Sequence, residues 1–214
     1  HILPPLNEII TIVKNDASFM VNGQVPLFSV TAKTFSEIKQ EVRSSIYSRS
    51  EKAVEKASVH DISVYWVNLN DEASAILSLD KSAVEIKGNM DIDKKEELLM
   101  AFSNMEIKKL VTKASITSFG LNWQHCNHTT FFPTYSHEQY YHALRRFLRF
   151  GQKREVIADI IISEGQQKVL DSLMVKNEKA NKMYEHLVSK TSVSFDVSSK
   201  QFNNKIKLPK FLNK

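Results

Sequence analysis

The sequence predicts an α/β fold in which helices cover both faces of a mostly parallel sheet. Short runs rich in Val and Ile alternate along the chain with longer segments of helix-forming residues. A Ser or Thr followed three residues later by Glu or Gln, a pattern typical of helix starts, occurs at Thr34, Ser136 and Ser163. Because parallel neighbours need a crossover connection, this alternation indicates βαβ units. With 214 residues the chain can bury one substantial core.

The N-terminal half is expected to begin with an extended Leu3-Pro4-Pro5 segment and a strand at Glu8–Val13. Residues 15–33 contain the turn signal Asn22-Gly23 and are expected to form a hairpin or a loop. A helix should follow from Thr34 to about Val59, a stretch without Gly or Pro. The next strands are expected at Ile62–Val67, Ala83–Ile86 and Ile107–Val111, and the next helices at Asp71–Leu79 and Ile92–Phe102.

The C-terminal half continues the alternation. A strand is expected at Thr129–Phe132, followed by a helix that starts at Ser136 and carries three arginines. Another strand is expected at Val156–Ile162, followed by a long helix from Ser163 to about Val188. Residues 190–214 form a basic tail of six lysines and one aspartate, which either is solvated or lies on phosphate.

Composition narrows the cellular compartments in which the protein is expected. The single cysteine, Cys126, excludes an internal disulfide and fits a reducing compartment. No apolar run approaches the length of a membrane span, and the N-terminus does not resemble a secretion signal. A cytoplasmic or nucleoid-associated protein is therefore expected, with no membrane partner. Because the first residue is not Met, the chain is expected to be a piece of something longer.

Phosphate loops are excluded by the glycine positions. None of the five glycines lies five residues before another, so neither GxxxxGK[ST] nor GxGxxG is present. Asp71-Glu72 follows a predicted strand and could suggest a magnesium site, but Asn70 or Asp71 as a helix cap is the better interpretation. His125, Cys126 and His128 lack the paired spacing of a zinc site, so no metal is expected and Cys126 is interpreted as a small buried residue.

The predicted arginine helix is the main functional candidate. Arg146 and Arg149 are three residues apart and share a face, opposite the apolar residues Tyr140, Leu144, Phe147 and Leu148. Two guanidinium groups held on a packed base suit an anion across a cleft. The alternative is a basic helix that simply faces solvent, and the residues alone leave both interpretations open.

Three blocks of residues follow the spacing of known motifs. The first runs from Lys87-Gly88-Asn89 to Phe102, and the second comprises Lys113-Ala114 and Phe119-Gly120-Leu121-Asn122, with two extra residues between its parts. The third consists of Pro133, Tyr135, Ser136, Ala143, Arg146, Arg149, Gly151 and Gln152. Together they resemble the C-terminal RecA-like lobe of superfamily-two helicases and DNA translocases, in the Swi/Snf-like branch with its phage and bacterial relatives. The resemblance covers about residues 60–165.

The resemblance departs from the family pattern at three positions. Tyr135 stands for the usual Trp, Ser136 for an Asn, and His142 for a Gln, while Arg145 has no counterpart. Gln139 could be confused with the motif's glutamine, but its place three residues after Ser136 favours a capping role.

The resemblance also implies roles for individual residues. Arg146 and Arg149 would be arginine fingers that face ATP on another lobe. Gly120, Leu121, Asn122 and Gln152 would lie at the cofactor cleft. Thr112, Lys113, Lys87 and Gly88 would lie near the nucleic-acid backbone.

The implied protein is the second motor lobe of an ATP-dependent nucleic-acid helicase or translocase, expected to act on DNA. Residues 1–34 would form the interlobe linker and an N-terminal strand or hairpin, residues 35–189 the lobe, and residues 190–214 the tail. ATP and Mg²⁺ would be held mainly by a first lobe absent from this chain, so this chain alone would bind neither and would be inactive. The alternative is a non-catalytic module that binds nucleic acid or protein.

Overall fold

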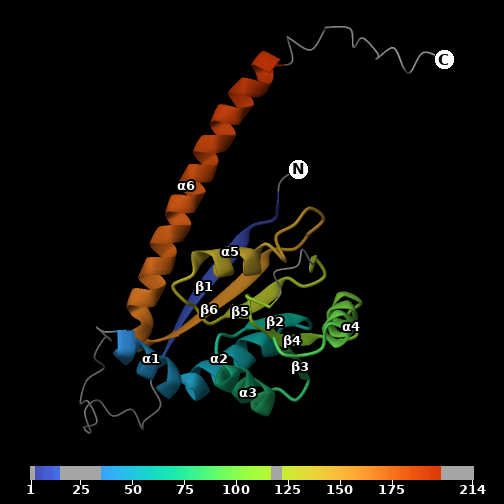
Figure 1. Ribbon diagram of the computed structural model, residues 1–214, viewed down its shortest axis with the longest axis vertical. Coiled ribbons are helices and arrows are strands. Elements are labelled where there is room, and N and C mark those ends of the chain that lie inside the picture. Colours follow the sequence, from blue (N-terminus) through green and yellow to red (C-terminus); the bar gives the residue numbers. More distant parts are fainter. Residues whose placement is uncertain (1–2, 15–34, 117–121, 199–214) are drawn as a thin grey trace, which may run out of the picture. The chain divides into compact units, whose positions relative to one another are not determined.

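A computed structural model describes residues 3–14, 35–116 and 122–198 of the chain (Figure 1). They form a six-stranded sheet in the order β1-β6-β5-β2-β4-β3, in which every pair of neighbours is parallel. The strands are β1 Leu6–Val13, β2 Ser63–Trp66, β3 Ala83–Ile86, β4 Lys109–Thr112, β5 His128–Phe131 and β6 Val156–Ser163. The predicted α/β class is confirmed, and the sheet is parallel throughout.

The helices are α1 Phe35–Ser44, α2 Ile46–Ser58, α3 Asn70–Leu79, α4 Ile92–Ser103, α5 His137–Leu144 and α6 Gln167–Ser198. A short 3₁₀ turn, Glu164–Gln166, leads into α6. The chain divides into two compact units, His1–Met174 and Val175–Lys214. The first contains the sheet and the start of α6, and the described part of the second is the remainder of that helix. No helix among the described residues has both the length and the hydropathy needed to span a bilayer.

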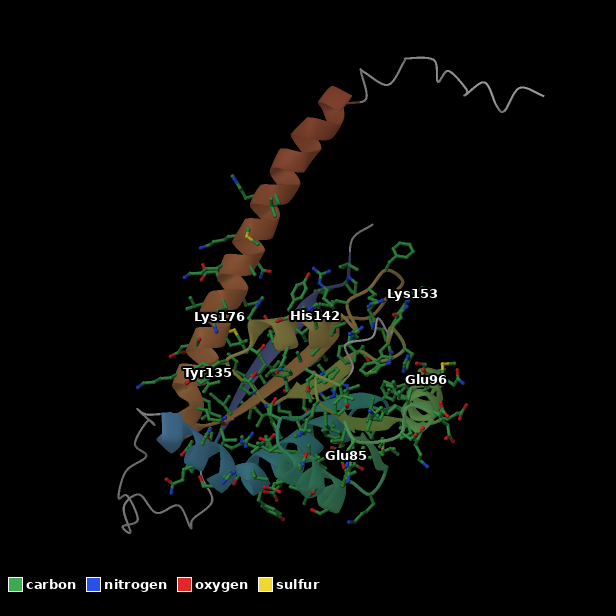
Figure 2. The ribbon with its side chains drawn as sticks, viewed as in Figure 1. Glu85, Glu96, Tyr135, His142, Lys153 and Lys176 are labelled. Atoms are coloured by element: carbon green, nitrogen blue, oxygen red, sulfur yellow. The ribbon has the colours of Figure 1, made fainter. Side chains whose placement is uncertain are left out.

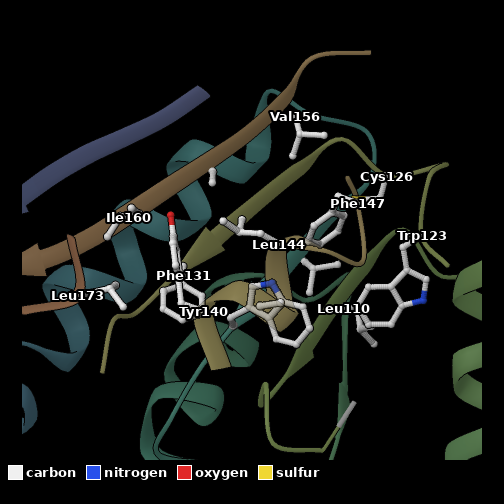
Figure 3. Close-up of a cluster of buried hydrophobic side chains, with 14 of the residues drawn as sticks. Leu110, Trp123, Cys126, Phe131, Tyr140, Leu144, Phe147, Val156, Ile160 and Leu173 are labelled. Carbon is white, nitrogen blue, oxygen red and sulfur yellow. The ribbon is translucent and has the colours of Figure 1, made fainter. Parts of the chain in front are cut away.

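Each face of the sheet has its own core. On one face, side chains from α4, α5 and the start of α6, among them Phe102, Leu144 and Leu173, form one cluster with Val64 and Trp66 of β2. Figure 3 shows part of this cluster, including Leu144 and Leu173. On the other face, residues of α2 and α3 pack on Tyr65 and neighbouring strand residues. Both faces of β2 are therefore buried, as expected for a central strand of a parallel sheet.

The long helix predicted from Thr34 to Val59 is interrupted at Ser45. The hydroxyl of Ser45 donates to the carbonyl of Glu41 at 2.8 Å, and Nη2 of Arg49 donates to the carbonyl of Val42 at 2.6 Å. Side chains thus hydrogen-bond to backbone carbonyls at the end of α1. Two helices, α1 and α2, replace the predicted single helix. Thr34 and the predicted hairpin or loop at 15–33 lie outside the described residues.

A buried polar cluster lies near the amino ends of β2 and β5. The imidazole of His128 is fully buried, with Nδ1 2.8 Å from the Ser63 hydroxyl and Nε2 3.0 Å from the Asp159 carboxylate. Nζ of Lys56 lies 3.3 Å from the same carboxylate. The amine of Lys109 donates to the carbonyl of Ala57 at 2.5 Å, at the end of α2. These contacts satisfy buried polar groups and cap a helix, which explains why the polar residues are tolerated there.

We expect His60 to make folding sensitive to acid. Its ring stacks on that of His128 with centroids 3.8 Å apart. Burial, and then the nearby His128 and Lys109 side chains, lower the pKa of His60 from 6.5 to about 4, although the charge of Asp159 opposes this. Between these two pH values His60 is protonated in the unfolded chain but neutral in the folded chain. The free energy of unfolding should therefore fall as the pH drops from about 6.5 towards 4.

Urea unfolding between pH 7 and pH 4 would measure this effect. The variant His60→Phe keeps an aromatic ring for stacking and should show a flatter dependence on pH. His142→Phe, at an exposed position on α5, should retain the wild-type dependence. Equal slopes for His60→Phe and wild type would contradict the assignment.

Candidate functional site

The arginines lie beyond the helix that was expected to carry them. Helix α5 ends at Leu144, and a series of tighter turns follows. The amide of Arg146 donates to the carbonyl of Ala143 at 3.2 Å, and the amide of Arg149 donates to the carbonyl of Phe147 at 3.1 Å. The predicted helical placement of Arg146 and Arg149 was therefore wrong. We call residues 145–152 the arginine turn.

The apolar side of this segment was predicted correctly. Tyr140, Leu144 and Phe147 are buried in the core of the first unit, and Leu148 packs against it (Figure 3). The hydroxyl of Tyr140 donates to the carboxylate of Glu8 on β1. These contacts hold the arginine turn on a rigid base.

Two like charges meet on the arginine turn. Arg146 is only 5% exposed, and burial, followed by the positive charge of Arg149, lowers the pKa of its guanidinium. Nε of Arg149 donates to the carbonyl of Arg145 at 3.1 Å, which orients that side chain. Arg145 lies over the ring of Tyr141 at 5.0 Å. Mutual repulsion between Arg146 and Arg149 would be relieved by an anion placed between them.

Hydrogen bonds join the arginine turn to the preceding loop, residues 122–127. The amide of Trp123 donates to the carbonyl of Arg146 at 2.9 Å. Nε2 of Gln152 donates to the carbonyl of Cys126 at 3.0 Å. Gly151 has φ of +101°, a backbone conformation that strains any residue with a side chain, and a Cβ there would also displace the carboxamide of Gln124. The loop and the turn therefore form one body.

The predicted cofactor-cleft residues have different surroundings. Gln152 is buried, and its carboxamide oxygen accepts from the amide of Arg154 at 3.1 Å while its nitrogen bonds backbone carbonyls. Its geometry suits holding the arginine turn in place. Asn122 is exposed beside Trp123. Gly120 and Leu121 lie outside the described residues.

The four predicted nucleic-acid residues come together. Lys87, Gly88, Thr112 and Lys113 line one pocket of about 550 Å³, which we call the β3–β4 pocket. It lies where β2, β3 and β4 end, because the carboxyl ends of parallel strands share one edge of the sheet.

Individual contacts differ within the β3–β4 pocket. Nζ of Lys113 donates to Oδ1 of Asn70 at 2.8 Å, and Nζ of Lys87 lies 3.4 Å from the carboxylate of Glu85. The hydroxyl of Thr112 is buried and points to the carbonyl of Ile86 at 3.4 Å. Lys87 and Lys113 are thus the side chains through which this pocket could meet a phosphate, with Gly88 offering backbone.

Helix caps near the pockets only partly follow the sequence patterns. The N-cap of α3 is Leu69, so the prediction of Asn70 or Asp71 as the cap was wrong, and the carboxylate of Glu72 accepts from the amides of Asn68 and Leu69 at 2.8 and 2.9 Å. The carboxylate of Glu72 reaches back past both residues to the two amides that precede the helix. The hydroxyl of Ser136 does accept from the amide of Gln139, at 3.3 Å, as the capping pattern predicts.

The sequence patterns missed Trp123 and Asn70, whose contacts with Arg146 and Lys113 are tertiary. Among the residues that the structure describes, no group of three His, Cys, Asp or Glu side chains is placed to hold a metal.

Cys126 should be chemically silent in the folded protein. The side chain is fully buried, as predicted, and burial raises the pKa of its thiol to about 12. Because only the thiolate attacks disulfides, an aromatic disulfide reagent at pH 8 should react with it only after unfolding in concentrated urea. Rapid reaction in native buffer would contradict the burial, and the rate in intermediate urea would report the opening of this core.

Comparison with known proteins gives no match by sequence. No protein-family profile matches this chain. No curated protein matches it either.

Solved structures do match, and the three described next have low sequence identity to this chain. The C-terminal part of the Fun30 ATPase domain superposes with a TM-score of 0.52 at 17% identity, covering 63% of this chain and 47% of that one. The fold is RecA-like. A Dbp5 variant of S. cerevisiae, bound to RNA and ADP-BeF3, superposes with a TM-score of 0.54 at 13% identity. The match covers 79% of the present chain and 38% of the Dbp5 chain.

The C-terminal domain of the same Dbp5 variant, bound to Gle1 and IP6, gives a TM-score of 0.53 at 15% identity. The match covers 62% of the present chain and 80% of the Dbp5 domain. The chain therefore spans less than half of the first two matched structures and most of the isolated C-terminal domain. At these identities the likeness establishes the fold.

Proposed function

We propose that this chain is the second motor lobe of an ATP-dependent nucleic-acid helicase or translocase of superfamily two. The observation that carries the proposal is the arginine turn, which holds the nearly buried Arg146 next to the partly buried Arg149 on a base fastened to the 122–127 loop. The motif resemblance at these residues and the RecA-like fold support it independently.

In the proposed mechanism, Arg146 and Arg149 are arginine fingers. ATP and Mg²⁺ are held by a first lobe, and closure of the two lobes brings both guanidinium groups to the γ-phosphate. There they stabilise negative charge as the phosphoryl group transfers. The repulsion between the two arginines is then compensated, which favours the closed state only while the phosphates are present.

The β3–β4 pocket is the proposed grip on nucleic acid. Lys87 and Lys113 meet backbone phosphates there, and Gly88 allows close approach of a strand. DNA is the proposed substrate because the motif spacing is nearest to DNA translocases. Alternate closing and opening of the lobes would move the strand relative to this grip.

The remaining parts of the chain take supporting roles in this proposal. Residues 1–34 connect the lobe to its partner lobe and contribute β1, residues 35–189 form the lobe, and the basic residues 190–214 add sequence-independent affinity for phosphate. The motif resemblance assigns Gly120, Leu121 and Asn122 to the nucleotide cleft.

ATP hydrolysis by two proteins tests the proposal: this chain alone and the natural protein that contains it. We expect turnover only from the latter, because no glycine pair in this chain can form a phosphate loop. Hydrolysis by the pure chain would contradict the half-motor assignment. Absence of hydrolysis in both, with nucleic-acid or protein binding retained, would instead favour the non-catalytic binding module.

A further inference from the structure

A second pocket, separate from the proposed machinery, lies at the carboxyl ends of β2 and β5. Its volume is about 730 Å³, and we call it the β2–β5 pocket. The chain leaves β2 towards β3 and β4 on one side, whereas β5 leads to β6 on the other. The strand order therefore reverses at this point, and the crevice at such a reversal is where open α/β sheets bind ligands.

The interior of the β2–β5 pocket is mainly apolar. Val42, Leu69, Pro133 and Val169 contribute to its walls. Tyr135, labelled in Figure 2, lies on the loop between β5 and α5, lines the same pocket and is 37% exposed. An apolar pocket with an accessible aromatic ring suits a flat, weakly polar group such as a nucleobase.

Positive charge surrounds this apolar interior. Lys39, Arg43 and Arg49 line the pocket, and its one acidic lining residue, Glu72, is paired with Arg49 at 2.9 Å. Arg43 is exposed and makes no ion pair among the described residues. Nη1 of Arg49 is buried and has no hydrogen-bond partner in the described part of the chain. The occupant should therefore carry negative charge beside its apolar part.

The start of α3 separates the two pockets. Asn70 lines the β3–β4 pocket, whereas Asn68 and Leu69 line the β2–β5 pocket. A strand that lies on Lys87 and Lys113 therefore has the β2–β5 pocket next along the same edge of the sheet.

We propose that the β2–β5 pocket binds one nucleotide unit, with its base against Tyr135 and the apolar walls and its phosphate at Arg43. This rests on the proposed function insofar as the nucleotide belongs to the strand held at Lys87 and Lys113. A free mononucleotide has the same chemistry and is the other source.

Photocrosslinking of the complete chain tests the placement of the base. Short oligothymidylate and oligouridylate strands that carry iodouracil should crosslink to Tyr135, as identified by mass spectrometry of the peptide. Adenosine monophosphate as competitor separates the two sources: abolition of the crosslink at low concentration indicates a free nucleotide site, and persistence indicates a strand site. Crosslinks confined to other residues would overturn the proposal.

Affinity measurements test the phosphate contact. Arg43→Gln should weaken oligonucleotide binding about fivefold and reduce the slope of log K against log salt by about 0.7, the contribution of one phosphate on a single strand. Tyr135→Ala should weaken binding by about fivefold or more through lost stacking. Lys94→Gln, an exposed cation on α4, is the matched control and should bind as wild type.

The outcomes separate this pocket from the proposed motor function. Weakening by Lys113→Gln but not by Arg43→Gln or Tyr135→Ala would overturn the nucleotide pocket and leave the motor proposal intact. Weaker oligonucleotide binding by Arg43→Gln, together with no ATP hydrolysis by the intact protein, would support the nucleotide pocket and overturn the motor proposal. Displacement of the strand by oligoglutamate at lower concentration than by oligothymidylate would assign the pocket to an acidic peptide and overturn the proposal.

Discussion

Replacing Arg149 with Ala in the proposed two-lobe protein is expected to lower kcat for ATP hydrolysis by about a thousandfold. The guanidinium is oriented through its Nε bond to the Arg145 carbonyl and contributes to the field around Arg146. Its loss should remove charge stabilisation that is needed only during transfer, so the affinities for ATP and nucleic acid should change little.

Steady-state turnover and equilibrium ATP binding together measure this effect. Arg145→Ala is the matched control, because Arg145 belongs to the same turn but lies over Tyr141, and the carbonyl that Arg149 uses is retained. Arg149→Lys should stay strongly impaired, since a single ammonium group cannot reproduce the planar fork. Turnover of Arg149→Ala within a few-fold of wild type would refute the finger assignment.

Replacing Glu72 with Ala should destabilise the chain by about 3–5 kcal/mol. Glu72 and Arg49 are both fully buried and lie 2.9 Å apart, so the variant leaves a guanidinium without its counter-ion. It also removes the carboxylate that accepts from the amides of Asn68 and Leu69 at the start of α3. Urea unfolding at pH 7 measures the loss.

Two further variants separate these contributions. Asp71→Ala, at the adjacent exposed position, should cost less than about 1 kcal/mol. The double variant Arg49→Met with Glu72→Leu removes both charges and should recover much of the loss, although not the cap. A double variant no more stable than Glu72→Ala would contradict a dominant charge effect.

The sheet could be predicted from the sequence because buried parallel strands produce short apolar runs that differ sharply from the helices between them. The meeting of Lys87, Gly88, Thr112 and Lys113 is a consequence of the same topology, since residues that follow parallel strands share one edge. For these residues, the family resemblance and the topology of the sheet indicate the same place.

The end of α5 could not be predicted in this way. Residues 145–150 are compatible with a helix, and the first glycine after them is Gly151. A continued helix would direct the Arg146 carbonyl to the amide of residue 150, but the amide of Trp123 binds that carbonyl instead. Likewise, the role of Gln152 depends on carbonyls brought near by folding, for which local sequence carries no signal.

The bond between Trp123 and Arg146 also gives the protein an intrinsic optical reporter. Trp66 and Trp123 are the only two tryptophans in the chain, both are buried, and their rings lie 5.8 Å apart. Because the backbone of one indole residue is bonded to the arginine turn, displacement of that turn should alter the emission and near-ultraviolet dichroism of the pair. Closure of the two proposed lobes could then be followed by stopped-flow spectroscopy without attaching a dye.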